Sequence, residues 1–283
     1  MCSSDLQARK PALIDALLIC SCHRGEAKRL TVDTSNPMVF QSCGEDGKVL
    51  LFDLREPHIC RRNGPTLANV SSCMSMDSHP LQPNSFIVSG ESSLVYSFDR
   101  RVPNQCQGVY SALSRESSSS HITGVAYNHN GTQLVASYSR GNPIFCFSTA
   151  DDSFATEDEV RNTRNANKFQ QQYEGHTNIR TVKSVNFFGA HSEYVVSGSD
   201  CGNIFLWNTF SGAIVNVFQG DRDIVNCIVV CISSISALTS IHKVLRDILM
   251  ILPYWPPRVL KMMCTCGVPV GTLRRHQKTL RTP

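Results

Sequence analysis

The sequence predicts an all-β fold, a β-propeller with about four recognisable blades. One sequence unit recurs four times: a turn with His, an alternating strand, a second strand with small residues, a tight turn, and a strand ending in an aromatic residue. Four short strands with turns between them make one propeller blade. The chain of 283 residues is long enough for one large all-β domain with a sizeable core.

The first two copies of the unit close on phenylalanine. The first copy runs from His23 through 41–47, where small residues precede a tight turn, to Phe52. The second copy begins at about Cys73 and closes on Phe98. Phenylalanine therefore takes the place that tryptophan holds in the last copy.

The third copy opens at His121 and closes on Phe147, and the fourth is the clearest of all. The fourth opens with Gly175 and His176 and closes on Trp207. Its four strands are expected at 181–187, 194–200, 204–207 and 213–218.

The polar residues of the unit are expected to be structural, because a buried His can bond a strand Ser or Thr and a turn Asp behind the aromatic ring. Of the turn positions, Asp46 fits well, whereas Ser92 and Cys201 stand at this place in the second and fourth copies. Those blades are candidates for an incomplete network. The structural set comprises His23, Asp46, Phe52, Phe98, His121, Phe147, His176, Ser197, Asp200 and Trp207.

The repeat divides the chain into three parts. Residues 1–22 form a lead-in or the last strand of a preceding blade, and 23–227 form the propeller segment, with a polar insertion at 148–172. The remainder, 228–283, has none of the repeat's turns, so we expect an unrelated, irregular tail. Since a propeller needs roughly four to eight blades, the expected ring is incomplete.

Composition bears on the partners and the compartment. Net charge is only +4, from 27 basic and 23 acidic residues mixed along the chain, which does not favour nucleic-acid binding. The 13 cysteines show no disulfide framework, so a reducing compartment is expected, cytoplasmic or nuclear. The uncharged stretch 224–241 is rich in polar residues and soon followed by Lys243, so a membrane span is not expected.

The sequence offers little for an enzyme, a cofactor or a metal. The stretch 44–48 has the wrong spacing for a phosphate-binding loop, and no His-Glu-x-x-His occurs. Cys20 with Cys22 and Cys264 with Cys266 are too closely spaced for an ordinary structural zinc site. A protein-binding role without catalysis is therefore expected.

An Asp and an Arg follow the closing aromatic in the first two copies, as Asp53 with Arg55 and Asp99 with Arg101. On a strand, residues two apart point to the same face, so each Asp can orient a guanidinium toward a partner's carboxylates or carbonyls. The alternative is an ordinary surface ion pair. Because the pattern occurs in consecutive blades, it favours a partner contact.

These residues carry a family resemblance. The segments 52–55 and 98–101 are Phe variants of Trp-Asp-x-Arg, and the chain from about 23 to 227, most specifically 197–202, resembles the WD-repeat cullin-4-associated factors. The likeness is to the branch that includes the eighth member and its plant relatives. The resemblance implies a non-catalytic substrate receptor that docks on the damage-specific DNA-binding protein adaptor of a cullin-4 ubiquitin ligase. A general WD-repeat scaffold in another complex, for example one handling chromatin or RNA, is the alternative.

Overall fold

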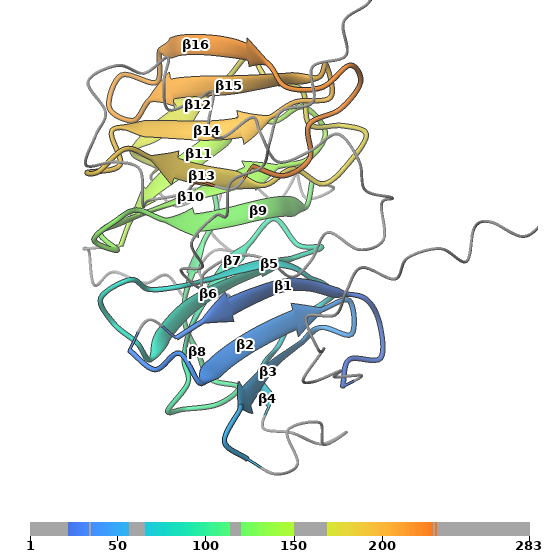
Figure 1. Ribbon diagram of the computed structural model, residues 1–283, viewed down its shortest axis with the longest axis vertical. Coiled ribbons are helices and arrows are strands. Elements are labelled where there is room, and N and C mark those ends of the chain that lie inside the picture. Colours follow the sequence, from blue (N-terminus) through green and yellow to red (C-terminus); the bar gives the residue numbers. More distant parts are fainter. Residues whose placement is uncertain are drawn as a thin grey trace, which may run out of the picture.

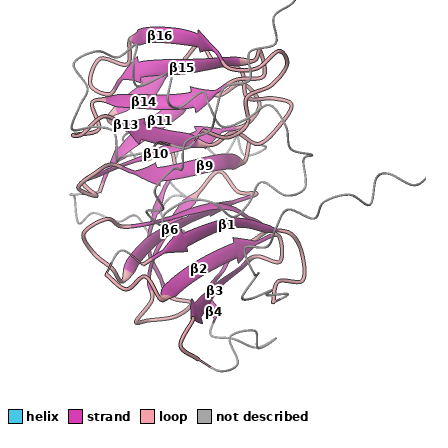
Figure 2. Cartoon of the chain, in the orientation of Figure 1, coloured by secondary structure: helices cyan, strands magenta, loops and turns pink. Residues whose placement is uncertain are grey.

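A computed structural model describes residues 22–33, 35–56, 66–113, 120–149, 169–228 and 230. Within these ranges every regular element is a β-strand (Figure 2). The strands form four sheets of four strands each, all antiparallel (Figure 1). The predicted all-β fold and the four propeller blades are confirmed.

Each sheet is built from strands that follow one another in the chain. The first sheet contains β1 (Ala27–Val32), β2 (Val39–Gly44), β3 (Lys48–Asp53) and β4 (Thr66–Asn69). The second contains β5 (Cys73–Ser78), β6 (Ser85–Gly90), β7 (Val95–Asp99) and β8 (Cys106–Tyr110).

The third and fourth sheets repeat this order. The third contains β9 (Ile122–Tyr127), β10 (Gln133–Tyr138), β11 (Ile144–Ser148) and β12 (Gln171–Tyr173). The fourth contains β13 (Val185–Phe188), β14 (Tyr194–Gly198), β15 (Asn203–Asn208) and β16 (Ile214–Gln219).

Neighbouring sheets pack face to face through apolar side chains. Phe86 and Leu67 belong to a buried cluster between the first two sheets, and Trp207 and Tyr173 to one between the last two. Burial of such aromatic and aliphatic surface is the main stabilising term of a stacked-blade fold.

The first strand of each sheet lies toward the middle of the molecule (Figure 1). Strand β9 runs alongside β5 in the same direction, with the Val125 amide 3.2 Å from Ser75 Oγ and the Tyr127 amide 2.8 Å from Asp77 Oδ2. A Cβ on Gly124 would lie 2.8 Å from the carbonyl oxygen of Lys183, just before β13 of the fourth sheet. Glycine is therefore needed where β9 approaches the fourth sheet.

The described sheets follow one another without closing into a ring. The hydrogen-bonded strand orders place β1–β4 in one sheet and β13–β16 in another, and no strand pairing joins these two sheets within the described ranges. This arrangement corresponds to the incomplete ring that the sequence predicts.

The segment after the fourth sheet takes the position of another inner strand. The Ile228 amide donates to Ser184 Oγ at 2.9 Å, as the Val125 amide does to Ser75 Oγ between earlier sheets. Ile228 is 5% exposed and packs with Phe188 and Leu206. The predicted start of the tail at residue 228 was therefore wrong by at least one residue, because Ile228 packs against the fourth sheet.

The predicted insertion at 148–172 also needs correction at both ends. Ser148 ends β11, and Gln171 and Gln172 begin β12, which pairs with β11 through Cys146↔Gln171. A strand this short and polar carries no hydrophobic alternation, so it was mistaken for part of a loop. Residues 150–168, the lead-in 1–21 and the tail from 231 lie outside the described residues. In the part of the chain that is described, no helix could span a membrane.

Candidate partner-binding face

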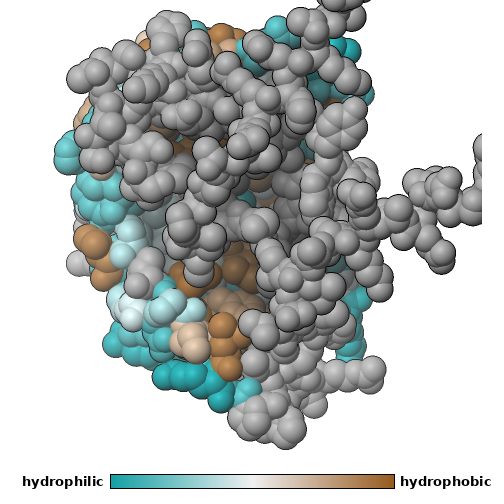
Figure 3. All heavy atoms as spheres, viewed as in Figure 1, coloured by the Kyte–Doolittle hydropathy of each residue, from teal (hydrophilic) through white to brown (hydrophobic). Residues whose placement is uncertain are grey.

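The Asp and Arg residues of the predicted motifs lie at one end of the sheets, called here the motif face. Asp53 ends β3 opposite Val39, and Asp99 ends β7 opposite Ser85, so the two aspartates occupy equivalent places. Strands β1 and β13 run toward this face, on the left of Figure 1. Hydrophilic residues predominate along the same edge in Figure 3.

Contacts between the loops link the first sheet to the second, and the third to the fourth, at the motif face. The His129 amide, after β9, donates to Ser192 Oγ, after β13, at 2.9 Å. Arg100, after β7, pairs with Asp33, after β1, at 2.6 Å. Neighbouring sheets are therefore joined at this face by side chains of their loops.

Arg55 forms a two-pronged ion pair with Asp53. Arg55 Nε lies 2.8 Å from Asp53 Oδ1, and Nη2 lies 2.5 Å from Oδ2. The hydrogen bonds from the Arg55 side chain and backbone hold the pKa of Asp53 at about 2. The Arg55 side chain is nevertheless 60% exposed, so a partner can reach the guanidinium.

Arg101 repeats this geometry in the second sheet. Its Nε and Nη2 atoms lie 3.0 and 2.5 Å from Asp99 Oδ1 and Oδ2, and its side chain is 71% exposed. The Arg101 side chain is also the main cause that lowers the pKa of Asp99. Consecutive sheets thus present two charged, oriented guanidinium groups, each with N–H groups beyond the two in its ion pair.

The pairing arises from a turn, and the prediction that each pair shares one face of a strand was wrong. The Arg55 amide donates to Asp53 Oδ1 at 3.0 Å, and the Arg101 amide donates to Asp99 Oδ1 at 2.8 Å. Each Asp caps the turn that follows its strand, and the turn folds the Arg side chain back onto the carboxylate.

Asp33 and Arg100 are functional candidates that the sequence did not reveal. The Asp33 side chain is 3% exposed, and that of Arg100 is 17% exposed. Arg100 Nε also donates to Asn84 Oδ1 at 2.9 Å. Burial raises the pKa of Asp33, but bonds from Ser35 and Arg100 outweigh it and lower the pKa. The only signal for Arg100 was its place beside Arg101.

The predicted His, Ser and Asp network is complete in the first sheet, at the opposite end from the motifs, called here the histidine face. His23 Nδ1 lies 2.8 Å from Asp46 Oδ1, and Nε2 lies 2.5 Å from Ser42 Oγ. The Arg24 amide also donates to Asp46. Burial raises the pKa of Asp46, but these bonds lower it overall. Each member of this network is thus held by another member.

The third and fourth sheets keep less of this network. His121 Nδ1 lies 3.1 Å from Ser139 Oγ. Both ring nitrogens of His176 lack a hydrogen-bond partner in the described structure, and the ring stacks edge-on against Trp207 at 5.5 Å. Burial, with the charge of Lys183, lowers the pKa of His176 to about 4.

Asp200 pairs with a lysine in place of the histidine. Its Oδ1 lies 2.5 Å from Nζ of Lys183, whose side chain is completely buried. The amides of Ile179 and Arg180 donate to Asp200 Oδ2 at 2.6 and 2.8 Å. Burial raises the pKa of Asp200, but these partners lower it to about 2. Asp200 therefore holds the loop before β13.

The remaining predicted structural residues pack inside the sheets. Trp207 is fully buried and donates through Nε1 to the Glu174 carbonyl at 2.8 Å. Ser197 Oγ donates to the Ser184 carbonyl at 3.0 Å. The closing aromatics Phe52, Phe98 and Phe147 are all buried.

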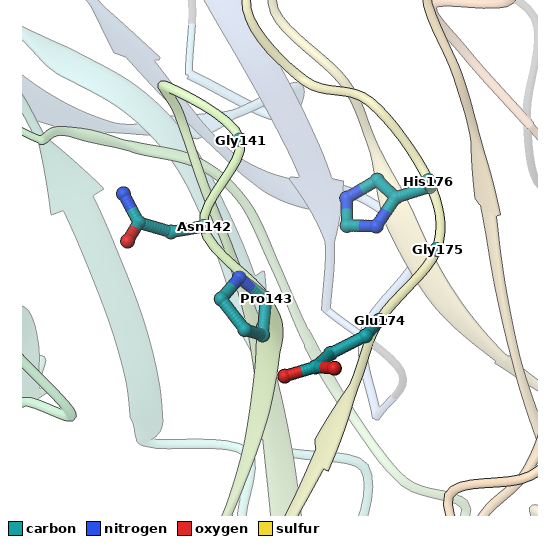
Figure 4. Close-up of a pocket in the computed structure, with 6 residues that line it drawn as sticks. All are labelled: Gly141, Asn142, Pro143, Glu174, Gly175 and His176. Carbon is teal, nitrogen blue, oxygen red and sulfur yellow. The ribbon is translucent and has the colours of Figure 1, made fainter.

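A cavity of about 240 Å³ lies beside His176, lined by Gly141, Asn142, Pro143, Glu174, Gly175 and His176. Figure 4 shows the His176 ring and the Glu174 carboxylate coming from one strand connection and Asn142 from another. Among the described residues, no three His, Cys, Asp or Glu side chains converge as a metal site. The lining residues include no Ser, Thr or Cys beside His176.

The four stacked four-stranded sheets define the class of protein as a β-propeller, and a family model matches one stretch of it. Residues 167–208 match the family model WD40, described as "WD domain, G-beta repeat". The matched range holds β12, β13, β14 and β15. The segment from β12 to β15 therefore matches a WD40 repeat.

Several curated proteins match parts of the chain. Human "WD and tetratricopeptide repeats protein 1" is 34% identical over 133 residues, which is 46% of this chain and 19% of the relative. "WD repeat protein iqw1" of Schizosaccharomyces pombe is 42% identical over 62 residues, covering 22% and 8%. Human "DDB1- and CUL4-associated factor 6" is 44% identical over 57 residues, covering 20% and 6%. The matches thus span less than a fifth of each relative's length.

Proposed function

We propose that the protein is a non-catalytic receptor that uses the motif face to dock on the damage-specific DNA-binding protein adaptor of a cullin-4 ubiquitin ligase. The observation that carries the proposal is the pair of oriented guanidinium groups, called here the forks, of Arg55 and Arg101. Both stand at equivalent places in consecutive blades, and both are exposed although oriented by an aspartate. Arginine in this state is a favoured hot-spot residue.

The physical advantage of the forks is that they are ordered before binding. A free arginine side chain loses rotamer freedom when it enters an interface, at about 0.5–1.5 kcal/mol per side chain. Asp53 and Asp99 already hold Arg55 and Arg101 in one orientation. The partner therefore meets two preorganised guanidinium groups that suit carboxylates and carbonyls.

One of the relatives supports this partner by name, since it is a factor associated with DDB1 and CUL4. The closer likeness to the eighth member of that family stays a prediction. In this proposal, another surface of the propeller presents a substrate protein, and the ligase acts in the cytoplasm or the nucleus.

A WD-repeat scaffold in another complex is the second candidate. The longest of the reported matches is to a protein named for WD and tetratricopeptide repeats, and that name refers to no ligase. Proteins that co-purify with the chain distinguish the candidates. A complex containing cullin-4 and its adaptor favours the receptor, and a stable complex without the adaptor favours the scaffold.

The proposal is tested by Arg55→Ala combined with Arg101→Ala. Hot-spot truncations cost about 2 kcal/mol or more each, so the pair should weaken binding to the purified adaptor by about a thousandfold. The melting temperature should stay unchanged, because both side chains lie mostly in solvent. Calorimetric titration and thermal unfolding of the same samples measure both quantities.

Arg180→Ala is the matched control, because Arg180 is 60% exposed and pairs with Asp223 at the histidine face. It should bind the adaptor as the wild type does. Replacing both motif arginines with lysine keeps the charge and removes the fork, so it should restore little of the affinity. Wild-type binding by the double alanine variant contradicts the receptor proposal, and joint loss of binding and stability indicates a structural role.

A further inference from the structure

The fourth sheet carries a different residue at the place of the motif arginines. Asn208 ends β15 opposite Tyr194, as Asp53 ends β3 opposite Val39. Two residues later, where the first sheet has Arg55, the fourth sheet has Phe210. In the third sheet the equivalent position is residue 150, outside the described residues.

The turn that presents Phe210 has the same design as the turns that present the arginines. The Phe210 amide donates to Asn208 Oδ1 at 3.1 Å, as the Arg55 amide does to Asp53 Oδ1 at 3.0 Å. The amide of Ser211 donates to the same oxygen at 2.9 Å. On the other side, Gln171 Nε2 donates to the Phe210 carbonyl at 2.6 Å. The backbone of Phe210 is thus fixed from two directions.

Phe210 is 82% exposed, the largest exposed fraction among the large hydrophobic residues described. An isolated exposed aromatic on a flexible loop needs no explanation. Phe210 differs because hydrogen bonds hold its turn and because it shares its topological place with two oriented arginines. Aromatic residues and arginine are the residue types most enriched at interface hot spots.

We propose that Phe210 is an apolar anchor of the motif face and inserts into an apolar pocket of the same protein that receives Arg55 and Arg101. The inference rests on the proposed function and adds the chemistry of the partner. That partner presents carboxylates or carbonyls opposite the first two blades and an apolar pocket opposite the fourth. Aspartate or asparagine at the end of the third strand orients each of the three contacts.

The test is Phe210→Ala, measured by titration with the purified adaptor. Loss of an aromatic anchor should weaken binding by about tenfold or more. Thermal stability should not change, since the side chain packs against little of its own chain. Phe210→Trp, which keeps a large apolar ring, should bind much better than Phe210→Ala.

Ile179→Ala is the matched control, because Ile179 is 64% exposed in the same blade but belongs to the loop before β13, at the histidine face. It should leave affinity unchanged, and equal weakening by both variants would overturn the inference. Unchanged binding of Phe210→Ala, with binding lost in the arginine double variant, overturns the inference alone. Retained binding by the arginine double variant overturns the proposed function and the inference with it.

The remaining alternative is that a second copy of this chain covers Phe210. Sedimentation of the protein without the adaptor tests this alternative. If Phe210 is covered by another copy, Phe210→Ala should shift a dimer to a monomer without adaptor present, and that shift would contradict the proposal. A monomer in both the wild type and the variant, with affinity lost only in the variant, supports it.

Discussion

Two buried histidines at equivalent places in the repeat differ in their hydrogen-bond partners. His23 is held by Asp46 and Ser42, whereas His176 is 8% exposed with both ring nitrogens unpaired. Lys183 pairs with the Asp200 carboxylate, so this carboxylate is not available to the His176 imidazole. A proton on His176 would therefore add a second buried positive charge beside Lys183.

This difference predicts a pH dependence of folding that is specific to His176. In the unfolded chain His176 binds a proton near pH 6.5, but in the folded chain it stays neutral down to about pH 4. The free energy of unfolding should thus fall by about 3 kcal/mol between these values. Urea unfolding of wild type and His176→Gln, between pH 7 and 4, measures it.

The His176→Gln variant should lose stability less steeply than the wild type over this window. Parallel pH profiles for wild type and His176→Gln would contradict the expectation. The position of His176 could be predicted from the repeat, but its lack of partners could not. That depends on Lys183, whose side chain turns inward from a neighbouring part of the chain.

The ion pair of Asp33 with Arg100 joins the first two blades at the motif face. It joins the end of β1 to the end of β7, next to Arg101, with both side chains largely buried. No sequence period could predict it, because it joins residues of different repeat positions. The fork of Asp99 with Arg101, by contrast, was predicted, because its members stand two residues apart.

Asp33→Asn should destabilise the protein by about 2 kcal/mol, as expected for a buried hydrogen bond to a charged group. Arg100 then keeps a neutral partner of similar shape but loses its counter-charge. Chemical unfolding measures the change, and Asp223→Asn, at an exposed pair of the histidine face, should cost under about 1 kcal/mol. Equal costs in the two variants would show that the blade contact is no stronger than a surface pair.

Recognition of strands from sequence depended on their length and on their apolar residues. Inner and central strands such as β6 and β14 are mostly buried, and their small and apolar residues repeat, so their places could be predicted. The outermost strands β4 and β12 were missed because they are four and three residues long and one of them is Gln-rich. Only their pairing with β3 and β11 defines them.

Across the whole molecule, each sheet covers the next, and Ile224–Ile228 covers part of the fourth. A Cβ on Gly198 would collide with the backbone oxygen of Val225. Gly198→Ala should therefore displace this segment and lower the free energy of unfolding by about 1–3 kcal/mol. Hydrogen exchange locates the effect: the Ile228 amide, bonded to Ser184 Oγ, should exchange faster.

The amide of Val125 provides the internal control, because it makes the equivalent bond to Ser75 Oγ between the second and third sheets. Its exchange should be the same in Gly198→Ala and in wild type. Faster exchange at both amides would mean that the substitution loosens the stack as a whole and that the last segment has no separate role.

Every sheet is built from consecutive strands, and this affects the order in which the blades fold. Most strand pairs, such as β1 with β2 or β14 with β15, join residues close together in the chain. Little loop-closure entropy is lost before such contacts form, so a blade can complete its pairing early during synthesis. The third sheet is the exception, because β12 must return across residues 149–170 to reach β11. That closure should make the third blade the slowest to form, and the fourth must wait for its packing surface.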